Sequence, residues 1–334
     1  MNRELALKIA DAVLYEGYML YPYRPSAIKN RQRWSFGTIY PPAYEEVARR
    51  TEPDRMRSEC LVSANTSAKI HVHLRFLHLL AREVFSSSGQ SIPSLLANGN
   101  IIETWEEGVP RSVELDFPLT DRSLRHPFYF GVFSESETLR DTEGHDLGRL
   151  RRSQQEVRGS VLSSVEPFRD GLWKLTLEVI NETVLDGDPA DRNRALLYSL
   201  LSAHSILSIQ GGTFLSLLDP PDELREVATT CSNKGNFPVL LGEPGSTDML
   251  LCSPILLSDY PQIAPESAGD FFDATEMDEM LTLRVMTLTD AEKKEMSLAD
   301  DRVRALLQRT EETARDQLMR THGVIRNLRP AEDR

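Results

Sequence analysis

The chain has 334 residues, of which 40% are hydrophobic and 27% charged, a composition typical of folded globular proteins rather than disordered ones. Its formal net charge of −13 argues against general binding to nucleic acid or to anionic membranes. A local basic surface, such as residues 24–33, remains compatible with that charge.

Three widely separated cysteines, Cys60, Cys231 and Cys252, form no disulfide framework and are typical of a reducing compartment. The first residues carry charges among apolar positions at helical spacing, so no secretory signal peptide is predicted. No apolar run approaches the roughly 18–20 residues that a membrane span requires. We therefore expect a cytoplasmic protein without a membrane span.

The chain begins with a predicted amphipathic helix over residues 3–15, ended by Gly17. Four prolines and several aromatic residues follow, which favour extended geometry and predict an ordered loop over residues 18–42. This loop is expected to be packed by its own aromatic side chains.

A block of predicted strands covers residues 56–185. Apolar residues alternate with polar ones, or run continuously, in six segments: 58–64, 68–81, 111–117, 127–133, 157–166 and 172–182. A short connection with Pro167, Asp170 and Gly171 predicts that this last pair is a hairpin. The polar segment 134–156 is predicted to be a long exposed loop or a mobile insertion.

The second half of the chain is predicted to begin with a helix over residues 189–209, with Pro189 in its first turn. Gly211 and Gly212 are interpreted as the C-cap of this helix. Short apolar runs follow at 213–218, 237–241 and 249–257, and Cys252 is predicted to be buried in the last of them. Three further helices are predicted, over 274–285, 289–297 and 299–319.

The fold class predicted from this order is α+β, with a largely antiparallel β-sheet core and helices at the N-terminus, in mid-chain and at the C-terminus. We expect one large unit over residues 1–334. Its substructure would comprise a helix and basic-aromatic loop (1–55), a β-rich core with helix 189–209 (56–258), and an acidic loop with C-terminal helices (259–334).

Two segments of the chain segregate opposite charges. Residues 17–44 hold four basic residues and seven aromatic residues without a carboxylate, whereas residues 259–279 hold seven carboxylates without a basic residue. Ordinary surfaces intersperse the two signs, so this segregation indicates a recognition surface or a site. The basic segment is interpreted as a loop docked internally against the acids, as a protein-binding surface, or as a platform for single-stranded nucleic acid, which the net acidity disfavours.

The acidic segment has its own alternatives. Carboxylates at its C-terminal end would complement the N-terminus of a following helix, the simplest interpretation. It would otherwise contact a partner, or hold a divalent cation through Asp270, Asp273 and Glu276, although their spacing does not match a calcium loop.

His71 and His73 are candidate metal ligands, because alternation on a strand projects both imidazoles from one face. Such a site needs further ligands, and we expect Glu59 or Cys60 on a neighbouring strand to supply one of them. The simpler interpretation is the solvent-facing polar side of an amphipathic strand. No phosphate-binding loop, dinucleotide fingerprint, nucleophile elbow, HExxH or CxxC motif is present, so no cofactor is predicted and the expectation of an enzyme is lowered.

Three segments, 13–41, 195–228 and 250–293, resemble an uncharacterised bacterial protein family associated with gene clusters for uptake-type nickel–iron hydrogenases. They are spread from end to end of the chain, so the resemblance concerns the whole protein. It implies a cytoplasmic accessory role in hydrogenase assembly, maturation or formation of an electron-transfer complex, with no catalytic residues to carry over.

An accessory protein without a cofactor motif is expected to act by holding another protein, a hydrogenase subunit or a maturation factor. The two charged segments would then supply the surface, since complementary charge sets partner choice. The predicted anchors are Tyr18, Tyr21, Tyr23, Arg24, Arg31, Arg33 and Trp34, with Asp270, Asp273 and Glu276 as an acidic rim. The alternatives are a metal-binding protein or metal-dependent enzyme that uses His71 and His73, and a scaffold unrelated to hydrogenase.

Overall fold

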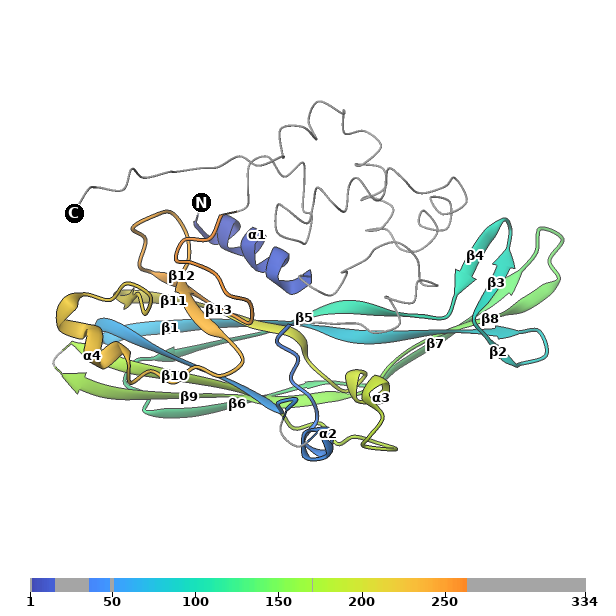
Figure 1. Cartoon of the computed structure of the whole chain (residues 1–334). Helices are drawn as coiled ribbons and strands as arrows, with labels where there is room; N and C mark the ends of the chain where they lie inside the picture. Colours follow the sequence, from blue (N-terminus) through green and yellow to red (C-terminus); the bar gives the residue numbers. More distant parts are fainter. Residues whose placement is uncertain (1, 16–35, 49–50, 170, 263–334) are drawn as a thin grey trace, which may run out of the picture. The chain divides into compact units, whose positions relative to one another are not determined.

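The computed structural model describes residues 2–15, 36–48, 51–169 and 171–262. These residues fall in one compact unit built mainly of β-strands, and every strand pair described in it is antiparallel. Strands from several parts of the chain join one large twisted sheet, and helices are few and short (Figure 1).

One very long strand, β1 (Arg55–Ser86), organises the sheet. Along its length it pairs successively with β10 (Leu172–Asn181), β11 (Leu201–Leu215), β5 (Trp105–Pro118) and β8 (Asp146–Gln154). Ile70, Val72 and Leu74 on one face of β1 are fully buried, because successive strand residues point to opposite sides. The alternation read from the sequence therefore sets the core face of this strand.

The main hydrophobic core lies between β1 and a second layer of strands. That layer consists of β6 (Ser123–Phe130), β9 (Val157–Arg169) and β10, which Figure 1 shows facing β1, β5 and β11. The Phe76 ring on β1 meets the rings of Phe128 and Phe130 on β6, with centroids 6.0 and 5.7 Å apart. The sheet thus curls until its end strand packs against its centre, which buries the apolar faces of both layers.

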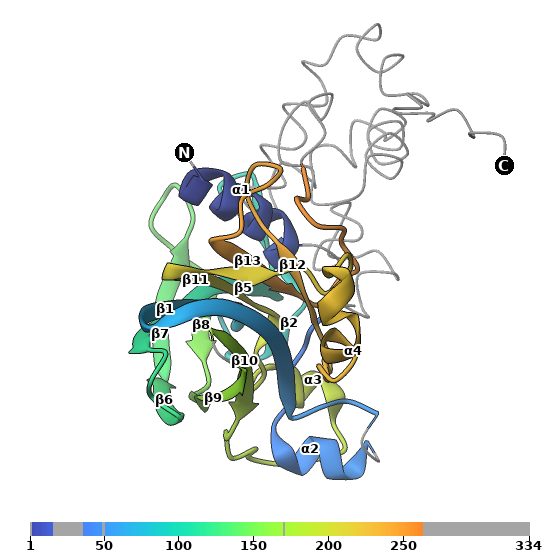
Figure 2. The same cartoon turned by 90° about the vertical axis from the view of Figure 1, so that its left-hand side faces the viewer.

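Helix α1 (Asn2–Tyr15) covers the opposite face of the sheet, over β11, β12 (Phe237–Leu240) and β13 (Met249–Ser253), as both views in Figures 1 and 2 show. Ala6, Ile9, Ala10 and Val13 of this helix form a second core with Ile206, Val239, Leu241, Met249 and Leu251. Burial of this apolar stripe is what holds so short a helix in place.

The far end of β1 continues into a β-arm away from the main core (Figure 1). The arm also contains β8, β7 (Phe133–Arg140), β2 (Ser91–Ile92) and the hairpin of β3 (Ser94–Ala97) with β4 (Asn100–Glu103). Val84, Leu139 and Leu150 form a small satellite core inside it. Asn98 and Gly99, both with positive φ, make the two-residue turn between β3 and β4.

The remaining helices are single turns: α2 (Pro42–Val47), α3 (Arg192–Leu196), the 3-10 turn η2 (Asp222–Leu224) and α4 (Arg225–Ala228). Two isolated bridges, Ile39 with Leu200 and Arg57 with Lys234, tie these connecting segments to the sheet.

Several sequence-based predictions are confirmed. The N-terminal helix, the strands at 58–64, 68–81 and 111–117, and the 157–166/172–182 hairpin are all present, and the sheet is antiparallel. The short runs at 237–241 and 249–257 include β12 and β13, and Cys252 is buried. The segment 127–133 spans the end of β6 and the start of β7 rather than a single strand.

Three predictions are wrong. The helix over 189–209 is only the five-residue α3, and the remainder belongs to β11. Gly211 and Gly212 therefore lie within a strand beside a register shift rather than at a helix C-cap. The polar segment 134–156 forms the hairpin of β7 and β8 instead of a loop.

The fold class consequently needs correction, because the described part of the chain is mainly β rather than α+β. The predicted loop 18–42 lies outside the described residues except for its last seven positions. The C-terminal helices predicted beyond residue 273 lie wholly outside them, and the proposed substructure of the chain remains a prediction.

Candidate functional site

All ten predicted partner-binding residues lie outside the described part of the chain: Tyr18, Tyr21, Tyr23, Arg24, Arg31, Arg33, Trp34, Asp270, Asp273 and Glu276. Their grouping into anchors and an acidic rim remains a prediction. The two candidate metal ligands, His71 and His73, lie within the described part of the chain, on β1.

His71 and His73 project from one face of β1, as their spacing predicts, and each meets a carboxylate of β5. His71 Nδ1 lies 2.9 Å from Asp116 Oδ1, and His73 Nε2 lies 3.8 Å from Glu114 Oε1. The two strands pair in a register that places His71 opposite Asp116 and His73 opposite Glu114. These are cross-strand polar pairs of the kind that stabilise a sheet surface.

The same row of β1 continues toward α1. Arg75 forms an ion pair with Asp11 of the helix, and its register partner on β11 is His204, which is fully buried. His204 Nδ1 lies 2.8 Å from the Ser202 carbonyl oxygen, so Nδ1 carries the proton of the neutral ring. Burial, together with the nearby Arg75 charge, lowers the pKa of His204 to about 3. The solvent exposure of the side chains in this row therefore falls from His71 toward Arg75 and α1.

The expected additional metal ligands do not approach this row. Glu59 and Cys60 lie on β1 itself rather than on a neighbouring strand, and eleven residues separate Cys60 from His71. That separation corresponds to about 36 Å of extended strand. Within residues 2–15, 36–48, 51–169 and 171–262, no group of three or more His, Cys, Asp or Glu side chains is arranged to hold a metal ion.

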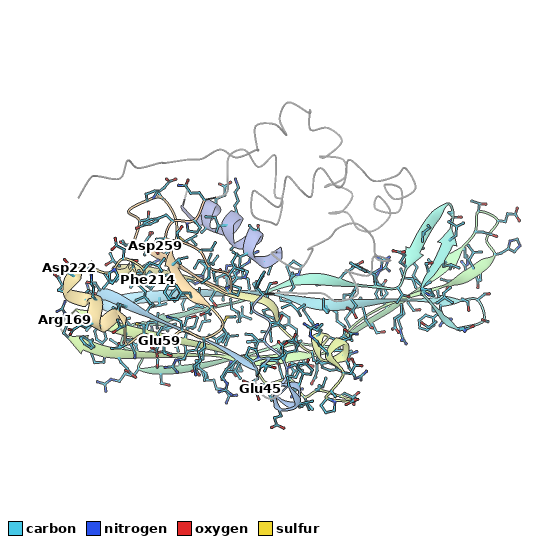
Figure 3. All side chains as sticks on the ribbon, in the orientation of Figure 1. Glu45, Glu59, Arg169, Phe214, Asp222 and Asp259 are labelled. Carbon is cyan, nitrogen blue, oxygen red and sulfur yellow. The ribbon has the colours of Figure 1, made fainter. Side chains whose placement is uncertain are left out.

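Glu59 instead forms a buried ionic cluster near the start of β1, beside the loop that follows α4 (Figure 3). Its carboxylate pairs with Arg57, accepts a hydrogen bond from the Ser232 backbone N–H at 2.7 Å, and lies 3.5 Å from Lys174 Nζ. Burial alone would raise the pKa of Glu59, but these partners outweigh it and hold the pKa below its usual value. Both carboxylate oxygens of Glu59 are thus engaged, Oε1 with Arg57 and Oε2 with Ser232 and Lys174. The arrangement ties strands β1 and β10 to the loop after α4.

The three cysteines are not reactive thiolates. Cys60 and Cys252 are buried in the main core, and burial raises the pKa of both thiols, to about 12 for Cys252. Burial raises the pKa of the partly exposed Cys231 to about 11, so little thiolate forms near neutral pH. Nucleophilic cysteine chemistry is therefore disfavoured at all three positions.

One arrangement of side chains was missed from the sequence. Arg111 on β5 donates a hydrogen bond from Nη2 to Gln154 Oε1 at 2.8 Å, and its guanidinium lies over the Phe130 ring, 5.1 Å from the centroid. His78 is fully buried nearby, with its ring beside the backbone of Gln155 and Leu197. Only the odd placement of an arginine at a core-facing position of an alternating strand could have indicated this cluster.

Exposed apolar side chains lie at the β6–β7 connection. Val132 and Phe133 have exposed fractions of 67% and 41%. Phe133 is the register partner of Gln154, the residue that holds Arg111, so the Phe133 and Gln154 side chains lie on one face of the sheet. We call Arg111, Val132 and Phe133 the β6–β7 surface. An arginine beside exposed apolar groups is typical of protein-binding hot spots.

No protein-family model matches the sequence, and comparison with curated proteins gives no match. Among the helices of the described residues, none is long and apolar enough to cross a membrane.

Proposed function

We propose that this chain is a non-catalytic cytoplasmic accessory protein that acts through protein–protein contacts in the assembly or maturation of a nickel–iron hydrogenase. The hydrogenase assignment depends on the resemblance of segments 13–41, 195–228 and 250–293 to the family associated with such gene clusters. The proposed mode of action, holding another protein, rests instead on the surface of the molecule.

The observation that carries this mode of action is the β6–β7 surface. The exposed Phe133 lies opposite Gln154, the residue that holds Arg111, and Arg111 has no carboxylate partner among the residues that the structure describes. The two layers of the curled sheet enclose a core filled by side chains, and this packed core gives such a surface a rigid support. The sequence separately predicts partner contacts by segments 17–44 and 259–279 through their aromatic and charged residues.

The experiment that tests this function is affinity purification of the tagged full-length chain from its own host, grown while hydrogenase is expressed. We expect a hydrogenase subunit or maturation factor to co-purify and to be identified by mass spectrometry. Recovery of the chain alone under those conditions, repeated after chemical cross-linking in cells, would contradict the assembly role.

The alternatives are separated by different measurements. A metal-binding protein or metal-dependent enzyme that uses His71 and His73 would retain stoichiometric metal after purification. A scaffold unrelated to hydrogenase would be encoded beside genes for neither a hydrogenase subunit nor a nickel-insertion factor.

A further inference from the structure

Among the residues that the structure describes, Arg111 has no carboxylate partner, unlike three other partly buried arginines. Arg57 pairs with Glu59 and Glu178, Arg75 pairs with Asp11, and Arg82 pairs with Glu107. Burying a guanidinium without an anion is costly, so this pairing is the usual solution. Arg111 instead has the neutral amide of Gln154 as its hydrogen-bond acceptor.

The guanidinium of Arg111 is held in a fixed orientation. The Phe130 ring lies against one side of it, and the Gln154 amide accepts from Nη2. Gln154 is itself buried and donates to the His78 carbonyl oxygen at 3.3 Å, so the acceptor is positioned by the sheet. An arginine constrained in this way loses little side-chain entropy when it binds a ligand.

Hydrogen-bonding capacity around Arg111 is incompletely used. Arg111 Nε is buried without a hydrogen-bond partner among the described residues. Native proteins leave few such groups, and each requires an explanation. An anion near Arg111 would supply the negative charge that the described residues do not provide at this position.

The side chains beside Arg111 indicate what should accompany the anion. Phe133 and Val132 are exposed at the start of β7, where Phe133 lies opposite Gln154 in the strand register. A free inorganic anion would not cover these groups, whereas a peptide with an apolar side chain would.

We propose that the β6–β7 surface binds a segment of a partner protein that presents a carboxylate beside an apolar side chain, with the carboxylate on Arg111 and the apolar group against Val132 and Phe133. This inference rests on the proposed function, because it assigns a surface to the partner contact. The planar guanidinium provides two parallel N–H donors for one carboxylate, which gives the contact its direction.

The test uses the purified full-length chain and two small probes, N-acetyl-L-phenylalaninate and its uncharged amide, followed by ligand-observed NMR titration. The first probe carries a carboxylate beside an aromatic ring and the second lacks only the charge. We expect saturable binding of the carboxylate probe in the millimolar range, as is usual for so small a ligand, and about tenfold weaker binding of the amide.

Variants assign the binding to this surface. Arg111→Gln is expected to weaken the carboxylate probe by about tenfold, and Phe133→Ser, a change at an exposed position, to weaken it by about threefold. Arg122→Gln, which removes the same charge from an exposed position after β5, should bind the probe as the original chain does. Circular dichroism and the unfolding temperature establish that each variant is folded.

Several results would overturn the proposal: no binding of the carboxylate probe, equal binding of the amide, or unchanged binding by both Arg111→Gln and Phe133→Ser. Acetate binding as tightly as N-acetyl-L-phenylalaninate would indicate a simple anion site instead. A dimer that Phe133→Ser dissociates would make a second copy of this chain the occupant. Because these probes involve no hydrogenase, failure here leaves the co-purification result standing, and the reverse also holds.

Discussion

The Glu59 carboxylate on β1 accepts a 2.7 Å hydrogen bond from the Ser232 backbone N–H, although 173 residues separate the two in sequence. A second bond, from the Glu59 N–H to Asn233 Oδ1, is also 2.7 Å long. The buried carboxylate and its cationic neighbours therefore fix the loop after α4 onto the start of the sheet.

Replacing Glu59 by Gln is expected to destabilise the protein by about 2–3 kcal/mol, because Arg57 and Lys174 would lose the buried anion between them. Urea unfolding followed by circular dichroism measures this change. The matched control is Glu166→Gln at an exposed position of β9, which should change stability by less than about 0.5 kcal/mol. Equal effects of the two substitutions would show that the Glu59 cluster contributes nothing specific.

Acid should destabilise the fold through His78. Burial, reinforced by the Arg111 charge, lowers the pKa of His78 from its usual 6.5 to about 4. Below about pH 6.5 the unfolded chain therefore binds a proton that the folded chain does not, and stability falls as the pH drops toward 4. For this one group the loss between pH 7 and pH 5 amounts to roughly 2 kcal/mol.

The variant His78→Leu isolates this contribution. Leucine removes the titrating ring from this buried position, together with its contacts to the backbone of Gln155 and Leu197. That loss lowers stability at every pH and leaves the pH slope as the readout. Urea midpoints measured from pH 7 to pH 5 should decline less in His78→Leu than in the original chain. His145→Gln, which removes an exposed histidine, should keep the original slope. A parallel decline in all three proteins would mean that His78 is not the responsible group.

Helix α1 should be held mainly by its apolar contacts. Ile9 is buried against the β11–β13 face, so Ile9→Ala is expected to cost about 2–4 kcal/mol and to weaken amide protection throughout α1. Hydrogen exchange monitored by mass spectrometry reports that protection. Lys8→Ala, one position away on the exposed side, should leave it intact. Full protection of α1 in Ile9→Ala would indicate that the helix is held by other contacts.

Metal analysis of the purified chain tests the role of the two strand histidines. We expect substoichiometric metal that does not change when His71 and His73 are both replaced by Ala, because no group of three or more metal-binding side chains is arranged around an ion among the residues that the structure describes. A stoichiometric ion that disappears in the double variant would instead support the metal-binding alternative. Zinc, nickel, iron and manganese should be measured together, since imidazole ligands bind several of them.

The sequence by itself determined those elements whose two faces differ. Ile70, Val72 and Leu74 alternate with His71 and His73 because one side of β1 meets the core and the other meets polar groups. The same asymmetry revealed α1 and the hairpin of β9 and β10. Local patterns suffice where burial is one-sided, since the period of the apolar residues then reports the backbone geometry.

Only the tertiary structure decided the elements whose environment lacks that asymmetry. Residues 201–207 of β11 are buried on both faces, by α1 on one side and the main core on the other, so their apolar run imitated a helix. The β7 strand is exposed on both faces except at Leu139, so its polar residues imitated a loop. The meetings of Glu59 with Ser232 and of Arg111 with Gln154 depend on long-range strand pairing, which no local periodicity encodes.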